Sequence, residues 1–329
     1  VVICHHQGQR FIETCLTSLR TSVGVTLEIL VVTSAQGASY EWLRHQPDIR
    51  LRWVEGGPAH KRNVGTAMAH GKIIVYLDDD TEVSPYTLYE FWRGFQELPQ
   101  AGMLFARIWN GERREELDDC GSWLTPTGFL YARASAGETR ETFLPIRCLA
   151  SKSAGCAINR EVFYDAGGFD AGYFILGEET DLAWRVWLRG HEVWVWPTAV
   201  LWHWFNTGAK PAADWYTLRR VHHYGARNYL SLLFTSLGTL RLVAILPLHL
   251  AIWVGAVLGF SLRGQWARGW HILRGHAEFW RHLPLKKRRQ VQQTRRVSDR
   301  DLWPHIARTP HWTYYPKRLI QYIWNGLHG

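Results

Sequence analysis

Apolar and polar positions along the first 110 residues predict strands that alternate with helices. Short apolar, β-branched runs indicate buried strands, and apolar residues three or four apart indicate helices. In chain order the predicted strands are Val1–Cys4, Leu27–Thr33, Ile49–Val54 and Lys72–Leu77, and the predicted helices are Arg10–Thr21, Tyr40–His45 and Ala59–His70. Strands that alternate with helices form βαβ units, so we expect an α/β fold with a mostly parallel sheet flanked by helices.

The pattern is less regular between residues 100 and 150 and then returns. Strands are expected near Met103–Trp109 and Gly128–Tyr131, with a polar loop at Ala134–Thr142. The elements predicted after this loop are a strand at Gly155–Asn159, helices at Arg160–Ala166 and Thr180–Arg189, and a strand at Glu192–Trp196 that ends at Pro197. From Trp215 the chain becomes apolar and basic. We therefore expect a catalytic domain over residues 1–212 and a helical C-terminal region over 213–329.

One apolar segment in the C-terminal region is long enough to span a bilayer. Asn228–Leu237 is apolar, and Leu242–Leu262 continues for 21 residues with few polar interruptions. A buried core helix is the competing interpretation, which Pro247 and two glycines also suit. The pattern alone leaves both open.

Composition and charge narrow the class of protein. A hydrophobic fraction of 47% excludes a disordered chain, and five scattered cysteines without a CxxC pair argue against a disulfide framework or a zinc site and suit a reducing compartment. The net charge of +9 is concentrated between Arg263 and Arg300, where eleven Lys and Arg residues face two acidic ones. Basic residues interleaved with some of the 19 Trp residues suit an anionic membrane surface or nucleic acid. Because the chain opens on Val1-Val2-Ile3 without a methionine, we expect no signal peptide in it and an N-terminus that was trimmed.

Three carboxylates, Asp78-Asp79-Asp80, follow the predicted strand Lys72–Leu77. This is the end of a parallel strand at which open α/β sheets bind ligands. Side chains alternate along an extended segment, so Asp78 and Asp80 face the same way. Two such carboxylates can hold Mg²⁺ or Mn²⁺ together with substrate phosphates. A solvated acidic turn would have the same sequence.

Two further groups of residues suggest chemistry. Glu178-Glu179-Thr180-Asp181 enters a predicted helix, where acidic residues also act as simple caps. His203 ends the apolar segment Ala199–His203 and is a candidate third ligand for a cation held by Asp80.

Together these pieces resemble the family 2 inverting glycosyltransferases, including rhamnosyltransferase-like bacterial members, over about residues 1–210. The order of the fragments carries the resemblance: Arg62-Asn63, Leu77-Asp78-Asp79-Asp80, the segments 155–163 and 167–170, then 178–185 and 197–203. The resemblance implies the GT-A fold, a nucleotide-diphospho-sugar donor, and Mn²⁺ or Mg²⁺ as cofactor.

The resemblance also implies roles for individual residues. Asp80, Asp78 and His203 would bind the metal, and Glu179, with Glu178 as the alternative, would be the general base that deprotonates the acceptor. Asp79, Thr33, Ser34, Arg62 and Asn63 would lie toward the donor. Arg185 and Arg160 are candidate phosphate or structural partners, and Asp181 is a further candidate site residue. One departure stands out: the second strand ends in Thr33-Ser34, where the family usually has aspartate. This leaves the donor open and allows a weakened or atypical enzyme.

Charge placement bears on the membrane. If Leu242–Leu262 crossed the bilayer from a cytoplasmic catalytic domain, the basic block would lie on the far side, against the positive-inside tendency. We therefore expect a peripheral or monotopic protein at the cytoplasmic face of the cell membrane, anchored at anionic headgroups by Arg263, Trp266, Arg268, Trp270, Arg274, Trp280 and Arg281. The corresponding acceptor is a lipid-linked or polysaccharide glycan, in particular one on polyprenyl diphosphate, as in cell-envelope polysaccharide biosynthesis.

Three other classes remain as alternatives. A processive polysaccharide synthase shares the catalytic domain, but the family's QxxRW motif is absent, because Gln292–Arg296 lacks its Trp. A catalytically weak protein that serves as a scaffold would explain why Thr33-Ser34 stands where the family usually has aspartate. A nucleic-acid-binding protein would use the basic, Trp-rich tail but leaves both acidic groups unexplained. We therefore expect an enzyme that transfers one hexosyl or deoxyhexosyl unit and no nucleic-acid partner.

Overall fold

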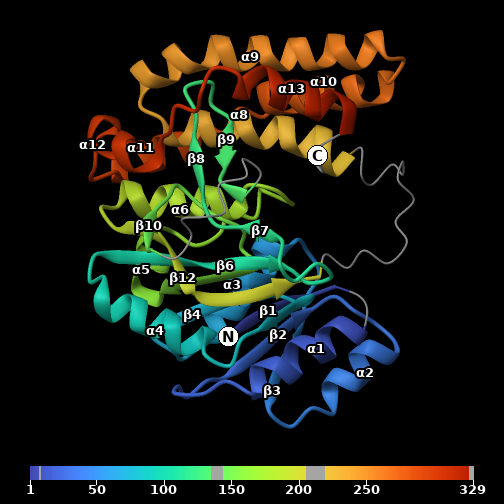
Figure 1. Ribbon diagram of the computed structural model, residues 1–329, viewed down its shortest axis with the longest axis vertical. Coiled ribbons are helices and arrows are strands. Elements are labelled where there is room, and N and C mark those ends of the chain that lie inside the picture. Colours follow the sequence, from blue (N-terminus) through green and yellow to red (C-terminus); the bar gives the residue numbers. More distant parts are fainter. Residues whose placement is uncertain (7–8, 135–143, 205–218, 326–329) are drawn as a thin grey trace. The chain divides into compact units, whose positions relative to one another are not determined.

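The structure is a computed structural model that describes residues 1–6, 9–134, 144–204 and 219–325 (Figure 1). The chain divides into two compact units. Unit 1 contains residues 1–122, 132–174 and 178–208, and unit 2 contains residues 123–131, 175–177 and 209–329. The domain boundary predicted at residues 212 and 213 lies outside the described residues, as does most of the loop predicted at Ala134–Thr142.

Unit 1 is built on one large mixed sheet. Its strands lie in the order β10-β12-β6-β11-β4-β1-β2-β3, and β5 and β7 pair with β12 and β6. The bounds are β1 Val2–His5, β2 Ile29–Thr33, β3 Ile49–Trp53, β4 Ile73–Asp78, β5 Thr81–Val83, β6 Ala101–Asn110, β7 Leu117–Asp119, β10 Ile146–Arg147, β11 Gly155–Asn159 and β12 Glu192–His203. Strands β4, β1, β2 and β3 are parallel, as predicted.

The direction of the strands brings distant parts of the sequence to one edge of the sheet. Strand β11 is antiparallel to both β4 and β6, and β12 is parallel to β6. Strands β4 and β12 therefore point the same way. The short strand β5 then pairs with the end of β12, with Thr81 opposite His203. This pairing carries the residues that follow β4 to the end of β12.

One predicted strand end is wrong. Pro197 does not end a strand at Trp196, because β12 continues through it to His203. The register against β6 shifts between Trp196 and Val200, which is the irregularity of a β-bulge. A bulge leaves a residue outside the hydrogen-bond ladder, so a proline without an N–H is tolerated there. The longer strand is what delivers His203 to the sheet edge.

Helices pack on both faces of the sheet. They are α1 (Gln9–Arg20), α2 (Ala38–Arg44), α3 (Pro58–Met68), α4 (Thr87–Glu97), α5 (Arg160–Asp165) and α6 (Glu178–Leu188). Alternate residues of β4 show the two faces. Val75 and Leu77 belong to the main core cluster with residues of α1 and α4, whereas Tyr76 packs against Phe163 and Phe169 and bonds to Thr66 of α3.

Unit 2 is mainly helical. It contains α8 (Gly225–Ser236), α9 (Thr239–Leu262), α10 (Trp266–Arg281), α11 (Leu285–Thr294), α12 (Asp299–Ile306) and α13 (Tyr314–Asn325), after the π-helical turn Arg219–Tyr224. Strands β8 (Ser122–Leu124) and β9 (Leu130–Ala132) form a separate two-stranded sheet. A second core cluster joins Ala226 of α8, Trp253, Ala256 and Phe260 of α9, and Ile272 of α10. Helix α9 is the one described helix long and apolar enough to cross a membrane.

Candidate active site

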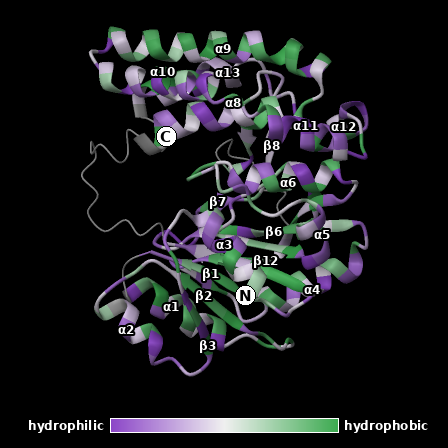
Figure 2. Ribbon diagram, turned by 180° about the vertical axis from the view of Figure 1, so that it is seen from behind, coloured by the Kyte–Doolittle hydropathy of each residue, from purple (hydrophilic) through white to green (hydrophobic). Residues whose placement is uncertain are grey.

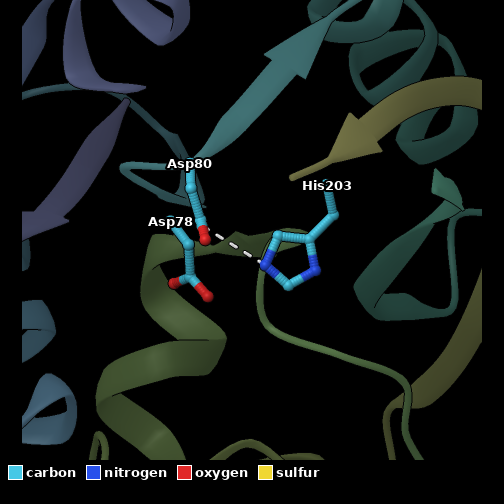
Figure 3. A group of neighbouring side chains, drawn as sticks. All are labelled: Asp78, Asp80 and His203. Carbon is cyan, nitrogen blue, oxygen red and sulfur yellow. Dashed lines mark ion pairs between the residues drawn. The ribbon is translucent and has the colours of Figure 1, made fainter. Parts of the chain in front are cut away.

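Asp78, Asp80 and His203 meet where strands β4 and β12 have their carboxyl ends (Figure 3). Asp78 is the last residue of β4, Asp80 lies in the turn that leads into β5, and His203 is the last residue of β12. One ligand atom from each of the three side chains lies within 4.8 Å of the others. The Asp80 Oδ1 and His203 Nε2 atoms are 3.3 Å apart. The structure thus brings together the three residues for which metal binding was predicted.

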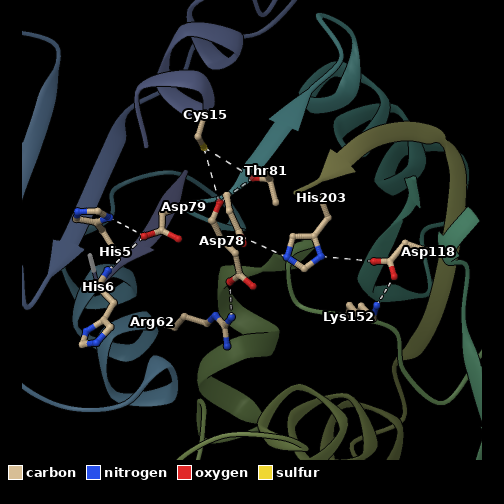
Figure 4. A network of polar contacts seen from close by, with 11 residues as sticks. His5, His6, Cys15, Arg62, Asp78, Asp79, Thr81, Asp118, Lys152 and His203 are labelled. Carbon is tan, nitrogen blue, oxygen red and sulfur yellow. Dashed lines mark hydrogen bonds and ion pairs between the residues drawn. The ribbon is translucent and has the colours of Figure 1, made fainter. Parts of the chain in front are cut away.

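A second carboxylate orients the His203 ring from its other side (Figure 4). Asp118 of β7 lies 3.4 Å from His203 Nδ1, and its second oxygen accepts from the Lys152 ammonium. Burial alone would lower the pKa of His203, but the hydrogen bonds to Asp118 and Asp80 raise it to about 9. A carboxylate on Nδ1 leaves Nε2 directed toward Asp80, the arrangement found around metal-binding histidines.

Arg62 of α3 connects the predicted metal ligands to the start of α6. Its guanidinium donates to Asp78 Oδ1 at 2.9 Å and to Glu178 Oε1 at 3.0 Å, and it lies over the ring of Phe169. Arg62 is only 2% exposed. Burial would lower its pKa, but Asp78 and Glu178 together raise it above the ordinary value. Arg62 was predicted to lie toward the donor; the structure shows it between two carboxylates.

The two glutamates at the start of α6 are in different environments. Glu178 is buried and paired with Arg62, whereas Glu179 is half-buried and accepts from the Thr180 hydroxyl at 3.3 Å. Burial, and then repulsion from Glu178, raise the pKa of Glu179 to about 8. A carboxylate with such a pKa can accept a proton near neutral pH.

Two predicted site residues bond to the backbone of residues 166–169, in the segment between α5 and α6, and a third pairs with one of them. The Asn63 amide donates to Phe169 O at 2.8 Å and accepts from Phe169 N at 2.9 Å. Arg185 pairs with the fully buried Asp181 at 2.6 Å and donates to the carbonyls of Ala166 and Gly168. These contacts use the polar atoms of Asn63 and Asp181 within the fold, and so position α6.

A polar cluster lies on the β1 and β2 side of Asp78. The Asp79 carboxylate accepts from His5 Nδ1 at 2.6 Å and from the His6 backbone N–H at 3.3 Å. Lys61 Nζ donates to His5 O and to Ser34 Oγ, both at 2.8 Å. Asp79 and Ser34, both predicted to lie toward the donor, are therefore close together.

Thr33, which was also predicted to lie toward the donor, is fully buried at the end of β2. Its hydroxyl accepts from Ala35 N at 2.8 Å, so it holds the turn that follows the strand.

Sequence reasoning missed Asp118, Lys152, Lys61, His5 and His6. Asp118 lies in the irregular stretch between residues 100 and 150, and its one signal is the adjacent pair Asp118-Asp119. His5-His6 directly follows the first strand, at the end of a parallel strand where ligands are expected, so its position was a usable signal. Lys61 precedes Arg62 on α3 and has no motif of its own.

The donor set fits a divalent cation. Two carboxylates and one imidazole nitrogen suit Mn²⁺, and the carboxylates also suit Mg²⁺. Arg62 neutralises Asp78 from the side of α6, whereas Asp80 and His203 face each other. Binding at His203 Nε2 requires loss of its proton, so cation binding competes with protonation at this ring.

Comparisons with known proteins relate part of the chain to glycosyltransferases. Residues 1–151 match the family model described as glycosyl transferase family 2. The match covers slightly less than half of the chain. An uncharacterized glycosyltransferase, YibD of Escherichia coli strain K12, is 32% identical over 97 residues, which are 27% of this chain and 27% of YibD. The chain thus matches about a quarter of the length of that curated relative.

Solved structures show that the fold is GT-A. The chain has a TM-score of 0.55 to S. aureus TarS 1–349, at 14% identity over 89% of this chain and 86% of that one. It has a TM-score of 0.51 to the mannosyltransferase PcManGT from Pyrobaculum calidifontis, at 17% identity over 98% of this chain and 87% of that one. PcManGT was solved with GDP-Man and Mn²⁺, and TarS 1–349 also with UDP-GlcNAc.

Proposed function

We propose that this protein is a metal-dependent, inverting glycosyltransferase that moves one sugar from a nucleotide-diphospho-sugar to a hydroxyl of a lipid-linked or polysaccharide acceptor. The observation that carries the proposal is the convergence of Asp78, Asp80 and His203, with Arg62 joining Asp78 to the start of α6. The family model that residues 1–151 match, and the GDP-Man and UDP-GlcNAc bound by proteins of similar fold, support this donor class.

The proposed step is a single displacement. The acceptor oxygen forms a bond to the anomeric carbon while the bond from that carbon to the diphosphate oxygen breaks, so the configuration inverts. Glu179 takes the proton of the acceptor hydroxyl, and the nucleoside diphosphate leaves with the electron pair. Glu179 is favoured over Glu178 because Glu178 is already engaged by Arg62.

Asp78, Asp80 and His203 would hold the Mn²⁺ or Mg²⁺, and Asp118 would keep the His203 ring in place. When bound, such a cation neutralises charge that develops on the departing diphosphate. The cluster of His5, Ser34, Lys61 and Asp79 lies at the end of β1 and β2 and would face the donor nucleotide.

The acceptor and the location are part of the proposal. Unit 2 carries the basic, Trp-rich segment of the sequence and the one described helix that passes the length and hydropathy test for a membrane span. We therefore place the enzyme at the cytoplasmic face of the cell membrane, as a peripheral or monotopic protein, where a polyprenyl-diphosphate-linked glycan would be its acceptor.

A donor screen tests the function. A panel of nucleotide-sugars is added with Mn²⁺ and the melting temperature is followed, because a ligand that binds the native state raises it. The donor identified in this way is then used for transfer, and the anomeric configuration of the product is read by NMR. We expect one donor to stabilise the protein only with the cation present, and an inverted product. A retained configuration, or no stabilisation by any nucleotide-sugar, would contradict the proposal.

An isosteric substitution tests the metal site. Asp80→Asn keeps the size of the side chain but removes a charged ligand, so we expect transfer to fall by roughly a hundredfold or more while the melting temperature without metal stays close to wild type. Asp48→Asn is the matched control, because Asp48 is an exposed aspartate of unit 1 paired with Arg20. Equal loss in both variants would show that the effect is not specific to the site.

A further inference from the structure

After Thr239 at its start, the exposed residues of helix α9 are all apolar. Leu240 is 91% exposed, Val254 57% and Leu262 89%. The spacing of three and four residues places them on one side of the helix together with the other exposed residues. We call this set the outer stripe; it consists of Leu240, Val243, Ala244, Pro247, Leu248, Ala251, Val254, Leu258 and Leu262. Figure 2 shows α9 as a largely hydrophobic helix.

The opposite side of α9 is packed within unit 2. Trp253, Ala256 and Phe260 belong to the second core cluster, against which Leu319 and Ile323 of α13 also pack. A Cβ atom added at Gly259 would lie 2.5 Å from Ile323 Cδ1, so the two helices are in close contact. The helices of unit 2 thus cover the side of α9 opposite to the outer stripe, and the stripe is not part of the core of that unit. A continuous exposed apolar surface of this kind marks an interaction site.

The partners of α9 argue against a transmembrane arrangement. A span needs about 20 apolar residues, but α10 has 16 residues and α13 has 12, and both carry charges. Arg274 and Arg281 are exposed on α10, and Lys317 is exposed on α13. If α9 crossed the bilayer, these packed helices would enter the hydrocarbon with it. A helix that lies in the plane of the interface avoids that cost.

Tryptophan and basic residues lie at both ends of α9. Arg263 and Trp266 directly follow its carboxyl end, and Arg288 of α11 donates to Thr239 at its amino end. Arg263 caps α9 and lies over the ring of Trp324, with 3.9 Å between the guanidinium carbon and the ring centroid. Trp266 and Trp270 follow on the exposed side of α10. Exposed basic residues continue along the chain at Arg274, Arg281, Lys286 and Arg289. Tryptophan prefers the headgroup region, and Lys and Arg are attracted to anionic lipids.

We propose that α9 lies in the plane of an anionic bilayer, with the outer stripe in the hydrocarbon and with Trp266, Trp270 and the basic residues of α10 and α11 at the headgroups. This proposal rests on the proposed function in one respect: the bilayer is where a lipid-linked acceptor would meet the enzyme. The occupant is lipid rather than a second copy of the chain, because the stripe continues into Trp and Arg residues that complement a negatively charged interface.

Vesicle sedimentation tests the surface. The full chain is mixed with phosphatidylcholine vesicles with and without phosphatidylglycerol, and bound protein is measured. We expect binding that is stronger with phosphatidylglycerol and that falls roughly tenfold or more in the double variant Val254→Glu, Leu258→Glu, because two charges would then have to enter the hydrocarbon in place of apolar side chains. Val23→Glu is the matched control, since Val23 is an exposed valine of unit 1, and it should bind like wild type.

Depth measurement separates an in-plane helix from a spanning one. A fluorophore is attached to Leu240→Cys, Ala251→Cys or Leu262→Cys, and its quenching by lipids brominated at different depths is compared. Four of the five native cysteines are buried, so labelling favours the introduced thiol. Equal shallow depths at all three positions support the proposal. A deep middle position with both ends shallow shows a span and overturns it.

Other results are also decisive. Absence of vesicle binding, or equal binding by wild type and the double variant, overturns the proposal. So does light scattering that shows a dimer of the wild type that the double variant loses, because the stripe is then covered by a second copy. Transfer to a water-soluble acceptor is measured in parallel. Transfer to this acceptor without vesicle binding would contradict the membrane proposal but not the proposed function. Vesicle binding without transfer would contradict the proposed function but not the membrane proposal.

Discussion

Removal of Arg62 should destabilise unit 1 because this side chain neutralises two carboxylates at once. Its guanidinium bonds to Asp78 at 2.9 Å and to Glu178 at 3.0 Å. The two acids differ in exposure: the side chain of Asp78 is 34% exposed, and that of Glu178 is 6% exposed. In the variant Arg62→Met water can solvate Asp78, but Glu178 is left as a buried charge without a partner.

The exposure of the partners sets the size of the effect. Breaking a buried ion pair by removing one member costs about 3–5 kcal/mol, since the remaining charge is uncompensated. Water screens the Asp78 half of the interaction, so we take the lower end, about 3 kcal/mol. Arg62→Lys should cost less, because it keeps the charge and loses only the two-armed geometry.

Native-state hydrogen exchange is the suitable assay. The two compact units need not unfold together, so a single melting temperature does not report on unit 1. Amides of β4 lie in the centre of the sheet and exchange through opening of that region. A loss of about 3 kcal/mol corresponds to exchange that is roughly a hundredfold faster.

The double variant Arg62→Met, Glu178→Gln provides the critical comparison. It removes the orphaned charge, so it should recover about 1 kcal/mol or more relative to Arg62→Met alone. The reasoning is refuted if β4 exchange changes less than about fivefold in Arg62→Met. It is equally refuted if the double variant exchanges faster than the single one.

Three further predictions concern Glu179, Asp118 and Gly65. The pKa of Glu179 is about 8 in the folded protein against an ordinary value of 4.5, so its contribution to stability is complete below pH 4.5 and is lost as the pH rises through about 8. Glu179→Gln should flatten that part of the stability profile measured in EDTA, and should abolish transfer, which in wild type rises over the same range. Asp118→Asn should weaken Mn²⁺ binding about ten- to a hundredfold in calorimetry, because Asp118 holds the His203 ring. Gly65→Ala should destabilise unit 1 by about 1–3 kcal/mol in β4 exchange, since its Cβ would lie 2.3 Å from Val2 Cγ1.

Each of these has a result that contradicts it. Retained transfer in Glu179→Gln together with loss in Glu178→Gln would assign the base to Glu178. Unchanged Mn²⁺ affinity in Asp118→Asn, with Glu116→Gln as the exposed control, would show that Asp118 does not position His203. Wild-type exchange in Gly65→Ala would mean that α3 moves away from β1 at little cost.

Much of unit 1 could be predicted because its signals are local. Apolar runs such as Lys72–Leu77 have the period and length of strands, and the end of a parallel strand is where ligands bind, so Asp78 and Asp80 could be named from the sequence. The order of the motifs then indicated the family, and residues 1–151 match it. These inferences need only the spacing of residues within one element and the sequence of elements.

Other features depend on contacts between residues far apart in the chain. His203 reaches Asp80 because β5 pairs with the end of a strand that continues past Pro197, where local rules predicted an end. Asp118 has no motif and acquires its role only from the His203 ring beside it.

The amino-acid sequence by itself determined most elements of unit 1, though not α4, β5, β7 or β10, and the acidic residues at the strand end, because helix and strand periods depend on neighbouring residues. The order of its motifs also indicated the family model that residues 1–151 match. It also showed that Leu242–Leu262 is apolar. Only the tertiary structure decided which side of that helix is covered and which is exposed, that Arg62 serves two carboxylates, and that Asp118 faces His203. The physical reason is that the burial of a side chain and its charge partners depend on the residues around it in space. Some of these residues lie more than a hundred positions away in the sequence, as Glu178 does from Arg62.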